Sequence, residues 1–393
     1  MNLYEDRFTF LNYNLKKYNW RLLILIILTT TFGLFVIESA ANGYARKQFL
    51  GMIIGFIAMI IVSFIDYNFI LQFHLPIYLA AVGMLVAVLL FGVNVNGARR
   101  WFALGSFGTI QPSEFAKIMM ILVLTHLIVE RKDRISQLRT LILIGIIYII
   151  PVFLIYKEPN MSTTLVYLFI FIMMIFCGGL SYRFIARVFL FAVPVIAFLV
   201  WYIQQPFQIL LHGYQLNRIL AFLNPSDYQQ TTANQQYNSV MAIGSGMITG
   251  KGYNNNTFTS VKGGNFISEQ QTDFIFAVAG EEYGFIGCTT IVLLLLAISF
   301  ECIRMSLRAK DLSGKILCCG MGGLIALQSF INICVATGMA PNTGTPLPFV
   351  SYGLTSLVSL YIGMGLVLNV GLQSSAYNKE IMKKELDRKE DYL

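Results

Sequence analysis

Long apolar runs, separated by shorter polar segments, fill most of the chain. A membrane-spanning helix needs about 20 consecutive, mostly apolar residues. Runs that approach this length cover residues 21–40, 48–66, 69–92, 113–130, 139–156, 163–180, 184–203, 273–302, 316–338 and 349–374. Because a bilayer admits only helices or closed barrels, the pattern predicts an all-α integral membrane protein with about ten transmembrane helices.

The apolar runs share one bundle, so we expect residues 1–393 to form a single polytopic membrane domain. The longest polar segment, residues 204–272, is rich in Asn, Gln, Gly, Ser and Thr and lies between the seventh and eighth predicted helices. A loop of that length in a compact protein is usually functional or disordered. Residues 375–393 are strongly charged and are predicted to form a cytosolic tail.

Basic residues alternate between the two sides of the predicted bundle. Most of the 28 Lys and Arg residues fall in segments 7–21, 131–139, 183–187, 304–315 and 379–389. Because positively charged connections stay in the cytosol, both ends of the chain are predicted on the cytosolic side. Residues 93–112 and the 204–272 loop are then extracytoplasmic.

Composition favours a membrane protein over a soluble one. Hydrophobic residues make up 56% of the chain and charged residues only 12%, against about 25% charged in a typical soluble domain. The net charge of +8 is spread over short connections, which excludes nucleic acid as a partner. The six cysteines and three histidines show no metal-binding spacing, so no metal site is predicted. The first apolar run is followed by further spans and is predicted to be a retained signal anchor.

Polar motifs that could carry chemistry concentrate on the outer face. Arg100 and Trp101 lie in the first outer connection, where cations run against the topological bias. These two residues are candidates for substrate binding. An aromatic anchor beside arginines that bind lipid headgroups is an equally good interpretation.

Ser113, Glu114 and Lys117 open the fourth predicted span. Ser113 can cap the helix, and Glu114 suits its positive end. Glu114 and Lys117 lie one turn apart and can pair. The pair is either a structural device that lets the span enter the membrane or a cation aimed at a phosphate and held in place by its carboxylate.

Asp273 is the strongest single candidate. It lies where the long polar loop enters the eighth predicted span, a position that also suits a helix N-cap. Glu281 and Glu282 follow roughly 12 Å deeper along a helix. Carboxylates within a membrane segment are costly and usually face a cavity or a partner. These acids indicate a site but do not identify its reaction.

Residues 338–353 contain three prolines and several glycines, which keep this stretch out of regular helix. Non-helical backbone near membrane depth requires surrounding protein or a cavity. Pro346, Pro348 and Ser351 are therefore candidates for the wall of a pocket. The alternative is an ordinary outer loop.

At these motifs the chain resembles the SEDS family (shape, elongation, division and sporulation), the RodA, FtsW and SpoVE proteins of bacterial cell-wall synthesis. The resemblance runs from about residue 18 to residue 373. Its motifs, in order, occupy residues 96–101, 111–117, 218–225, 242–252, 272–287 and 341–353. Several separated motifs in the right order make the resemblance specific.

The resemblance implies a peptidoglycan glycosyltransferase with ten membrane helices in the bacterial cytoplasmic membrane and an extracytoplasmic active site. Such an enzyme polymerises lipid II into glycan strands with inversion and releases undecaprenyl diphosphate. Asp273 matches the family's essential aspartate, and Trp101, Glu114 and Lys117 fall on motif positions important for activity. The implied partners are a class B penicillin-binding protein, which is a transpeptidase, and the elongation or division machinery.

The chain departs from the family pattern in three places. The family usually reads Gln-Pro-Asp-Leu-Gly-Thr where residues 158–163 read Glu-Pro-Asn-Met-Ser-Thr, and a Phe-Gly-Gly-Ser-Ser run is replaced at residues 352–356. A usual proline and histidine are Ser268 and Gln271 here. These changes concern loop geometry more than the reaction. Residues 65–67 and the short tail favour a RodA-like role in cell shape and elongation, with FtsW-like division and sporulation members as alternatives.

In the mechanism we expect, Asp273 accepts the proton of a sugar hydroxyl as that hydroxyl attacks an anomeric carbon. Lys117, Arg100 and Arg218 would supply positive charge to the leaving diphosphate. A divalent cation, Mg²⁺ or Mn²⁺, could share this task, although the sequence shows no ligand cluster for it. The alternatives are a flippase or transporter of lipid-linked precursors, and a scaffold that recruits a transpeptidase. A flippase should carry polar residues through to the cytosolic face, whereas here they crowd the outer face.

Overall fold

A computed structural model describes residues 18–373, apart from residues 42, 96–97, 104, 106–108, 159, 204, 206–212, 224–233, 255–259, 261–266 and 268. For residues 95 and 98, and for parts of the helices at 182–203 and 213–223, it describes the backbone only. The predicted tail at 375–393 and much of the predicted 204–272 loop lie outside the described residues.

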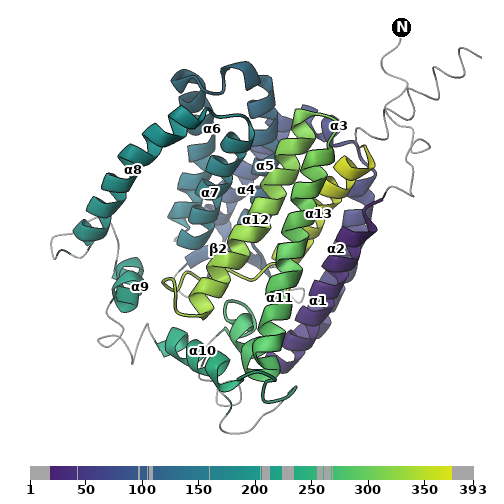
Figure 1. Ribbon diagram of the computed structural model, residues 1–393, viewed down its shortest axis with the longest axis vertical. Helices are drawn as coiled ribbons and strands as arrows, with labels where there is room; N and C mark the ends of the chain where they lie inside the picture. Colours follow the sequence, from purple (N-terminus) through teal and green to yellow (C-terminus); the bar gives the residue numbers. More distant parts are fainter. Residues whose placement is uncertain are drawn as a thin grey trace, which may run out of the picture.

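The described chain folds into a bundle of long helices (Figure 1). They are α1 (Trp20–Ala40), α2 (Tyr44–Ser63), α4 (His74–Phe91), α5 (Pro112–Glu130), α6 (Leu138–Lys157), α7 (Met161–Cys177), α8 (Tyr182–Ile203), α11 (Ile275–Arg308), α12 (Leu312–Ala336) and α13 (Leu354–Leu372). Each long helix matches one predicted span, so the all-helical, multi-pass prediction is confirmed. Within the described residues, 8 helices are long and apolar enough to cross a bilayer, and α7 is apolar but shorter.

Helix boundaries differ from the predicted ones where polar residues are helical. α2 begins at Tyr44 rather than at residue 48, so Arg46 and Lys47 lie in its first turn. The predicted span 69–92 divides into the short α3 (Tyr67–Gln72) and α4. The Asp66 side chain caps α3 by accepting a hydrogen bond from the Asn68 N–H. The two helices meet at Phe73, whose backbone (φ −89°, ψ 24°) leaves the helical range. This residue is apolar, so the apolar run gives no sign of the break and one span was predicted.

The interior of the bundle is built from helices that are distant in sequence. Most residues of α5 and α13 are buried, whereas α4 is largely exposed. α13 packs on α2, α11 packs on α12 and α1, and α5 contacts both α12 and α13. This packing brings the starts of α5, α11 and α13 to the same end of the bundle.

That end, called the outer end below, also carries α9 (Gly213–Leu223), α10 (Asn234–Ser245) and a small sheet (Figure 1). The strands β1 (Val93–Val95), β2 (Ala98–Ala103) and β3 (Thr109–Ile110) pair antiparallel in the order β1-β2-β3. Val95 pairs with Ala98, so β1 and β2 form a tight hairpin. No strand was predicted here. The available signal was the Asn-Gly dipeptide at residues 96–97, which is typical of two-residue hairpins.

α11 contains a break at Gly284, whose backbone (φ 62°, ψ −155°) is not helical. The preceding carbonyls of Glu281 and Glu282 accept hydrogen bonds from the N–H groups of Lys251 and Gly252, at 2.9 and 3.1 Å. On the other side of the break, residues 285 and 286 donate to the carbonyls of residues 247 and 248 at 2.8 and 3.2 Å. The segment after α10 therefore satisfies the backbone groups that the break leaves open, as buried backbone requires.

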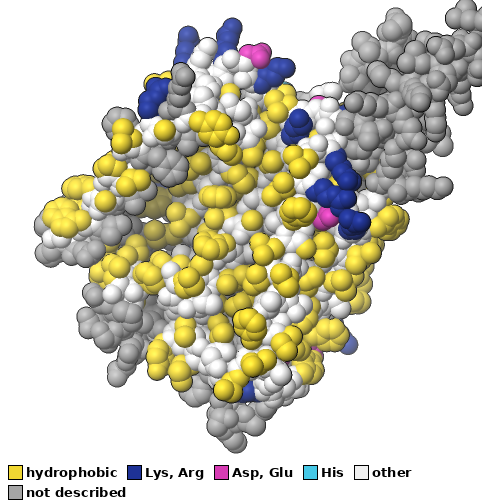
Figure 2. All heavy atoms as spheres, in the orientation of Figure 1, with side chains coloured by type: hydrophobic (Ala, Val, Ile, Leu, Met, Phe, Trp, Pro, Cys, Tyr) yellow, Lys and Arg dark blue, Asp and Glu magenta, His cyan; other side chains and the backbone are white. Residues whose placement is uncertain are grey.

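Hydrophobic side chains cover much of the face of the bundle that Figure 2 shows. Lys and Arg side chains gather toward the end opposite the outer end, near the start of α6 (Figures 1 and 2). An apolar belt with a basic end fits a bundle that lies in a bilayer with that end in the cytosol.

Candidate active site

A cavity of about 660 Å³ opens at the outer end of the bundle. The small sheet, the start of α5, α9, α10, the entry to α11 and the α12–α13 connection all contribute to its wall. It gathers five of the predicted site residues, namely Trp101, Glu114, Arg218, Asp273 and Pro346. Its other lining residues include Thr109, Gln111, Gln235, Glu269, Thr272, Phe274, Asn342, Gly344, Tyr352, Gly353, Leu354, Thr355 and Ser356.

Asp273 lies in this wall immediately before α11. The helix begins at Ile275, with Phe274 in the N-cap position and no capping side chain. Asp273 therefore does not cap the helix, contrary to the alternative considered from the sequence. Its carboxyl group faces a cavity lined largely by polar side chains and is available for chemistry.

The backbone around Asp273 is fixed by side chains from elsewhere in the bundle. The Asn332 side-chain amide, on α12, donates to the Asp273 carbonyl at 2.8 Å and to the Thr345 carbonyl at 2.6 Å. Ser351 donates from Oγ to the Thr272 carbonyl at 2.5 Å. These bonds clamp the non-helical α12–α13 connection against the entry to α11, so the position of the carboxyl group is set before any substrate arrives.

Gly344 allows Asp273 and Arg218 to lie close together. A Cβ atom at Gly344 would stand 3.0 Å from Asp273 Oδ2 and 3.9 Å from Arg218 Nη1, and its φ of +71° is one that other residues rarely adopt. Arg218 donates from Nη1 to the Asn342 carbonyl at 3.1 Å, which holds its guanidinium in the cavity wall. The absence of a side chain at Gly344 thus sets the spacing between an acid and a cation.

We expect Gly344→Ala to lower glycan polymerisation by roughly 10- to 100-fold, because small displacements of a reacting group are costly. The added methyl also strains the backbone by about 1–2 kcal/mol. The matched control is Gly105→Ala, since Gly105 has a φ of +58° but open space around its Cβ position. Both variants should lose similar thermal stability, and only Gly344→Ala should lose activity in an in-vitro polymerisation assay. Equal activity in the two variants would contradict the proposed spacing role.

Burial raises the pKa of Asp273 to about 6. The nearby cations of Arg218 and Arg100 act in the opposite direction, and the carboxylate of Glu269 adds to the increase. A carboxyl group with a pKa in this range can take up a proton near neutral pH, as a general base must.

Arg100, on β2, reaches the α6–α7 connection. It donates from Nε to the backbone carbonyl of Glu158 at 2.8 Å, and its guanidinium carbon lies 5.9 Å from the centre of the Trp101 ring. Burial raises the pKa of Glu158 to about 8, which the charge of Arg100 offsets only in part. Burial therefore makes Glu158 hold its proton more tightly than an ordinary glutamate, which reduces the negative charge beside Arg100.

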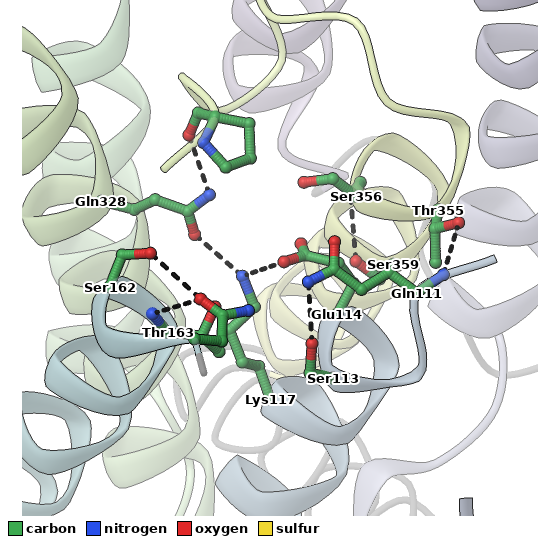
Figure 3. A network of polar contacts seen from close by, with 12 residues as sticks. Gln111, Ser113, Glu114, Lys117, Ser162, Thr163, Gln328, Thr355, Ser356 and Ser359 are labelled. Carbon is green, nitrogen blue, oxygen red and sulfur yellow. Dashed lines mark hydrogen bonds and ion pairs between the residues drawn. The ribbon is translucent and has the colours of Figure 1, made fainter. Parts of the chain in front are cut away.

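Glu114 and Lys117 form an ion pair at the inner side of the cavity (Figure 3). Lys117 Nζ lies 2.9 Å from Glu114 Oε1, and both side chains are almost completely buried. Lys117 also donates to Gln328 Oε1 at 3.0 Å, and Gln328 in turn donates to the Pro346 carbonyl at 3.0 Å. The pair is thus linked through α12 to the same connection that holds Asp273.

Glu114, but not Lys117, appears among the described residues that line the cavity. Glu114 Oε2 is buried without a hydrogen-bond partner in the structure. Glu114 therefore holds an unsatisfied acceptor oxygen at the cavity wall, while Lys117, which pairs with it, does not line the described cavity. Lys117 can contact a phosphate, as predicted, only if this ion pair rearranges. A hydroxyl or amide donor could bind Glu114 without such a rearrangement.

Glu281 and Glu282 do not line this cavity within the described residues. Glu281 pairs with Lys251 at 2.7 Å, and Glu282 accepts a hydrogen bond from Ser39 on α1. They brace the break in α11. Pro348 is buried in the α12–α13 connection and does not reach the cavity lining either.

No three His, Cys, Asp or Glu side chains come together as a metal site in the described part of the chain. The predicted Mg²⁺ or Mn²⁺ stays a prediction.

The sequence analysis did not identify four residues of the site, Gly344, Asn332, Gln328 and Glu269. For Asn332 and Gln328 the available signal was a polar amide side chain within an apolar helix, because a buried side chain of this kind must find hydrogen-bond partners.

Comparison with known proteins places these features in a family. The model of the cell cycle protein family FtsW, RodA and SpoVE matches residues 19–376. Stage V sporulation protein E of Bacillus subtilis is 34% identical over 90% of this chain and 96% of that protein. A probable peptidoglycan glycosyltransferase FtsW of Geobacter sulfurreducens is 30% identical over 91% and 95%. Peptidoglycan glycosyltransferase MrdB of Escherichia coli is 28% identical over 92% and 95%.

Solved structures show the same fold. A chain from a peptidoglycan synthase complex that coordinates polymerization and crosslinking aligns with a TM-score of 0.75 and 27% identity, over 90% of this chain and 97% of that one. The rod shape determining protein RodA of Thermus thermophilus aligns with a TM-score of 0.64 and 25% identity, over 90% and 96%.

Proposed function

Because the chain belongs to the FtsW, RodA and SpoVE family of multi-pass membrane proteins, whose relatives include peptidoglycan glycosyltransferases, we propose that it joins lipid II units into glycan strands. It is a peptidoglycan glycosyltransferase. The proposal adds the substrate, lipid II, and the place of the reaction, the cavity around Asp273. The observation that carries it is a clamped carboxyl group with a raised pKa, beside Arg218, in a polar cavity at the outer end of a membrane bundle.

In the proposed reaction, the 4-hydroxyl of N-acetylglucosamine on one lipid II attacks the anomeric carbon of N-acetylmuramic acid at the end of the growing chain. The new bond joins that oxygen to the anomeric carbon, and the bond from the carbon to the diphosphate breaks. Asp273 takes the hydroxyl proton as the bond forms, which typically contributes about 10²–10⁴-fold. A single displacement of this kind inverts the anomeric centre.

The leaving undecaprenyl diphosphate needs positive charge close to the reacting carbon. Arg218 lines the cavity, and Arg100 is near enough for its charge to lower the pKa of Asp273. We assign these two arginines to the diphosphate, because arginine matches phosphate oxygens in a fork geometry. Trp101 lines the same wall and offers an apolar face to a sugar ring.

Polymerisation by the purified protein in detergent tests the proposal. A polymerase should convert lipid II to glycan strands without any membrane, since the reaction needs no sidedness. A flippase or transporter of lipid-linked precursors would give no polymer under these conditions. A scaffold alone would give none until an active partner is added, and its effect would survive replacement of Asp273. Titration with Mg²⁺ and Mn²⁺ in the same assay tests the predicted cation.

The pH dependence of polymerisation should report the pKa of Asp273. The base must be deprotonated, so activity is retained above a pKa of about 6 and should fall about tenfold per pH unit below it. The carboxylate of Glu269 contributes to the raised value, so Glu269→Gln should move the fall in activity to lower pH. The measurement is kcat/KM for lipid II from pH 5 to about 8. A profile that is flat across this range would contradict the assignment of Asp273 as the base.

Among the family branches we propose an FtsW-like role in cell division. Similar proteins include FtsW of Geobacter sulfurreducens and stage V sporulation protein E, and this supports the division and sporulation alternatives better than the RodA-like preference drawn from residues 65–67. A fluorescent fusion in the source bacterium should gather at the division site. Labelling along the lateral wall would instead support the elongation role.

We also propose a class B penicillin-binding protein as the partner, following the similar chain found in a synthase complex. We place this partner on one face of α11, where Leu293, Leu296, Phe300, Ile303 and Leu307 are exposed. Their spacing of three and four residues suits packing against a single additional helix. Co-purification of the transpeptidase with the wild type, and its loss after Leu296→Asn and Phe300→Asn, tests this interface.

A further inference from the structure

A second cavity, of about 390 Å³, lies between α1 and α2 near their outer ends. It shares no lining residue with the active-site cavity. Its wall comes from Thr31, Leu34, Phe35 and Glu38 on α1, from Ala45, Arg46 and Phe49 on α2, and from Tyr253 after α10. We call this cavity the α1–α2 groove.

The groove changes from charged to apolar with depth. Its α1 wall uses positions i, i+3, i+4 and i+7, which form one face of a helix. Because a helix rises 1.5 Å per residue, Thr31 lies about 10 Å deeper than Glu38. The side chains of Phe35 and Phe49 are about half exposed, so the apolar part opens toward the surrounding bilayer. The charged groups Glu38 and Arg46 stand at the outer rim.

Hydrogen bonds to the rest of the bundle hold the two helices that form the groove in place. Ser39 on α1 donates to the buried Glu282, and the Ala40 carbonyl accepts from Gln270 at 2.7 Å. On α2, Gln48 donates to the Ser351 carbonyl at 3.0 Å and accepts from the Gly353 N–H at 3.1 Å. The groove is therefore preformed, as small-molecule sites usually are.

The size of the groove selects its occupant. A helix about 10 Å across with a 5.4 Å pitch fills roughly 400 Å³ per turn. The groove is about two turns long, so a partner helix of that length would lie mostly outside its volume of about 390 Å³. A single acyl chain fits the apolar part. Glu38 and Arg46, which form no ion pair with each other in the described structure, then lie at the depth of a lipid headgroup.

We propose that the α1–α2 groove is a binding site for a zwitterionic phospholipid that carries a primary amine, of the phosphatidylethanolamine class. Arg46 binds the phosphate, because arginine is a strong donor to phosphate oxygens. Glu38 accepts hydrogen bonds from the ammonium group, and one acyl chain lies along Leu34, Phe35 and Phe49. An anionic headgroup such as phosphatidylglycerol meets repulsion from Glu38, and a choline headgroup has no N–H to donate.

Native mass spectrometry of the full-length, delipidated protein in detergent tests this site. Phosphatidylethanolamine, phosphatidylglycerol and phosphatidylcholine of identical acyl chains are added in equal amounts, and the bound lipid is quantified. The wild type should retain phosphatidylethanolamine in preference to the other two lipids. Arg46→Gln should reduce that retention roughly tenfold, the loss expected for one charge-assisted hydrogen bond. Glu38→Gln should abolish the preference for phosphatidylethanolamine over phosphatidylglycerol.

Lys47→Gln is the matched control, because Lys47 is an exposed cation next to Arg46 that does not line the groove. It should bind phosphatidylethanolamine as the wild type does. All of these side chains are exposed, so the variants should fold, and equal unfolding temperatures of the delipidated proteins check this. Equal retention of the three lipids by the wild type, or equal losses in Arg46→Gln and Lys47→Gln, would overturn the proposal. Lipid binding is measured without turnover, so the result is independent of the proposed polymerase activity.

Discussion

Replacement of Asp273 by asparagine should leave a protein that inserts and folds normally but makes almost no glycan from lipid II. The Asp273 carbonyl, not its carboxyl group, accepts the hydrogen bond from Asn332 that clamps this segment. Asparagine retains that backbone contact and the side-chain volume, but it cannot accept the proton. We expect polymerisation to fall by about 10²–10⁴-fold, the usual contribution of a positioned base.

The measurement is the initial rate of polymer formation by purified wild type and Asp273→Asn, together with their unfolding temperatures. Glu269→Gln is the matched control, since Glu269 lies four residues earlier and lines the same cavity. It should keep most of the activity at neutral pH. Normal polymerisation by Asp273→Asn would remove the base from the mechanism, and comparable losses in both variants would point to a general effect of charge in the cavity.

The second large effect concerns the buried pair of Glu114 and Lys117. Breaking a buried ion pair from one side leaves an uncompensated charge and costs about 3–5 kcal/mol. We therefore expect both Glu114→Gln and Lys117→Met to lose stability as well as activity. Replacing both residues together leaves no buried charge, and the double variant should regain most of the stability.

The activity of the double variant separates a structural pair from a functional one. If Glu114 Oε2, which has no partner in the structure, accepts a hydrogen bond from a sugar hydroxyl or amide, the double variant should fold but remain about 10- to 100-fold less active. If the pair only stabilises the bundle, activity should return with stability. Unfolding temperatures and polymerisation rates of the two single variants and the double variant decide between these roles.

The number and order of the spanning helices could be predicted from the sequence, because lipid requires each span to be long and apolar. The residues that gather at the outer end could be named, since Asp273 and Glu114 border apolar runs and Arg218 falls on a family motif. The distances between these side chains could not be predicted from the sequence. They depend on how α5, α9 and the α11 entry pack, and periodicity within one helix carries no information about its neighbours.

The sequence also did not reveal the uncharged residues that shape the site. Gly344 resembles any loop glycine until the structure shows Asp273 Oδ2 3.0 Å from where a Cβ would stand. Glu281 and Glu282 are the opposite case, because their charges drew attention to residues that do not line the described cavity. Acids in a membrane span usually indicate a functional cavity, but these two meet Lys251 and Ser39 instead. The sequence shows the cost of burying a carboxylate but not which residue offsets that cost.

The break at Gly284 has a mechanical consequence. The segment at 247–252 forms hydrogen bonds to α11 on both sides of the break, at residues 281 and 282 before it and at residues 285 and 286 after it. When the membrane thins, thickens or is stretched, helices adjust by tilting. Because one segment holds both sides of the joint at Gly284, the short upper piece and the long lower piece of α11 should tilt together and carry the segment at 247–252 with them.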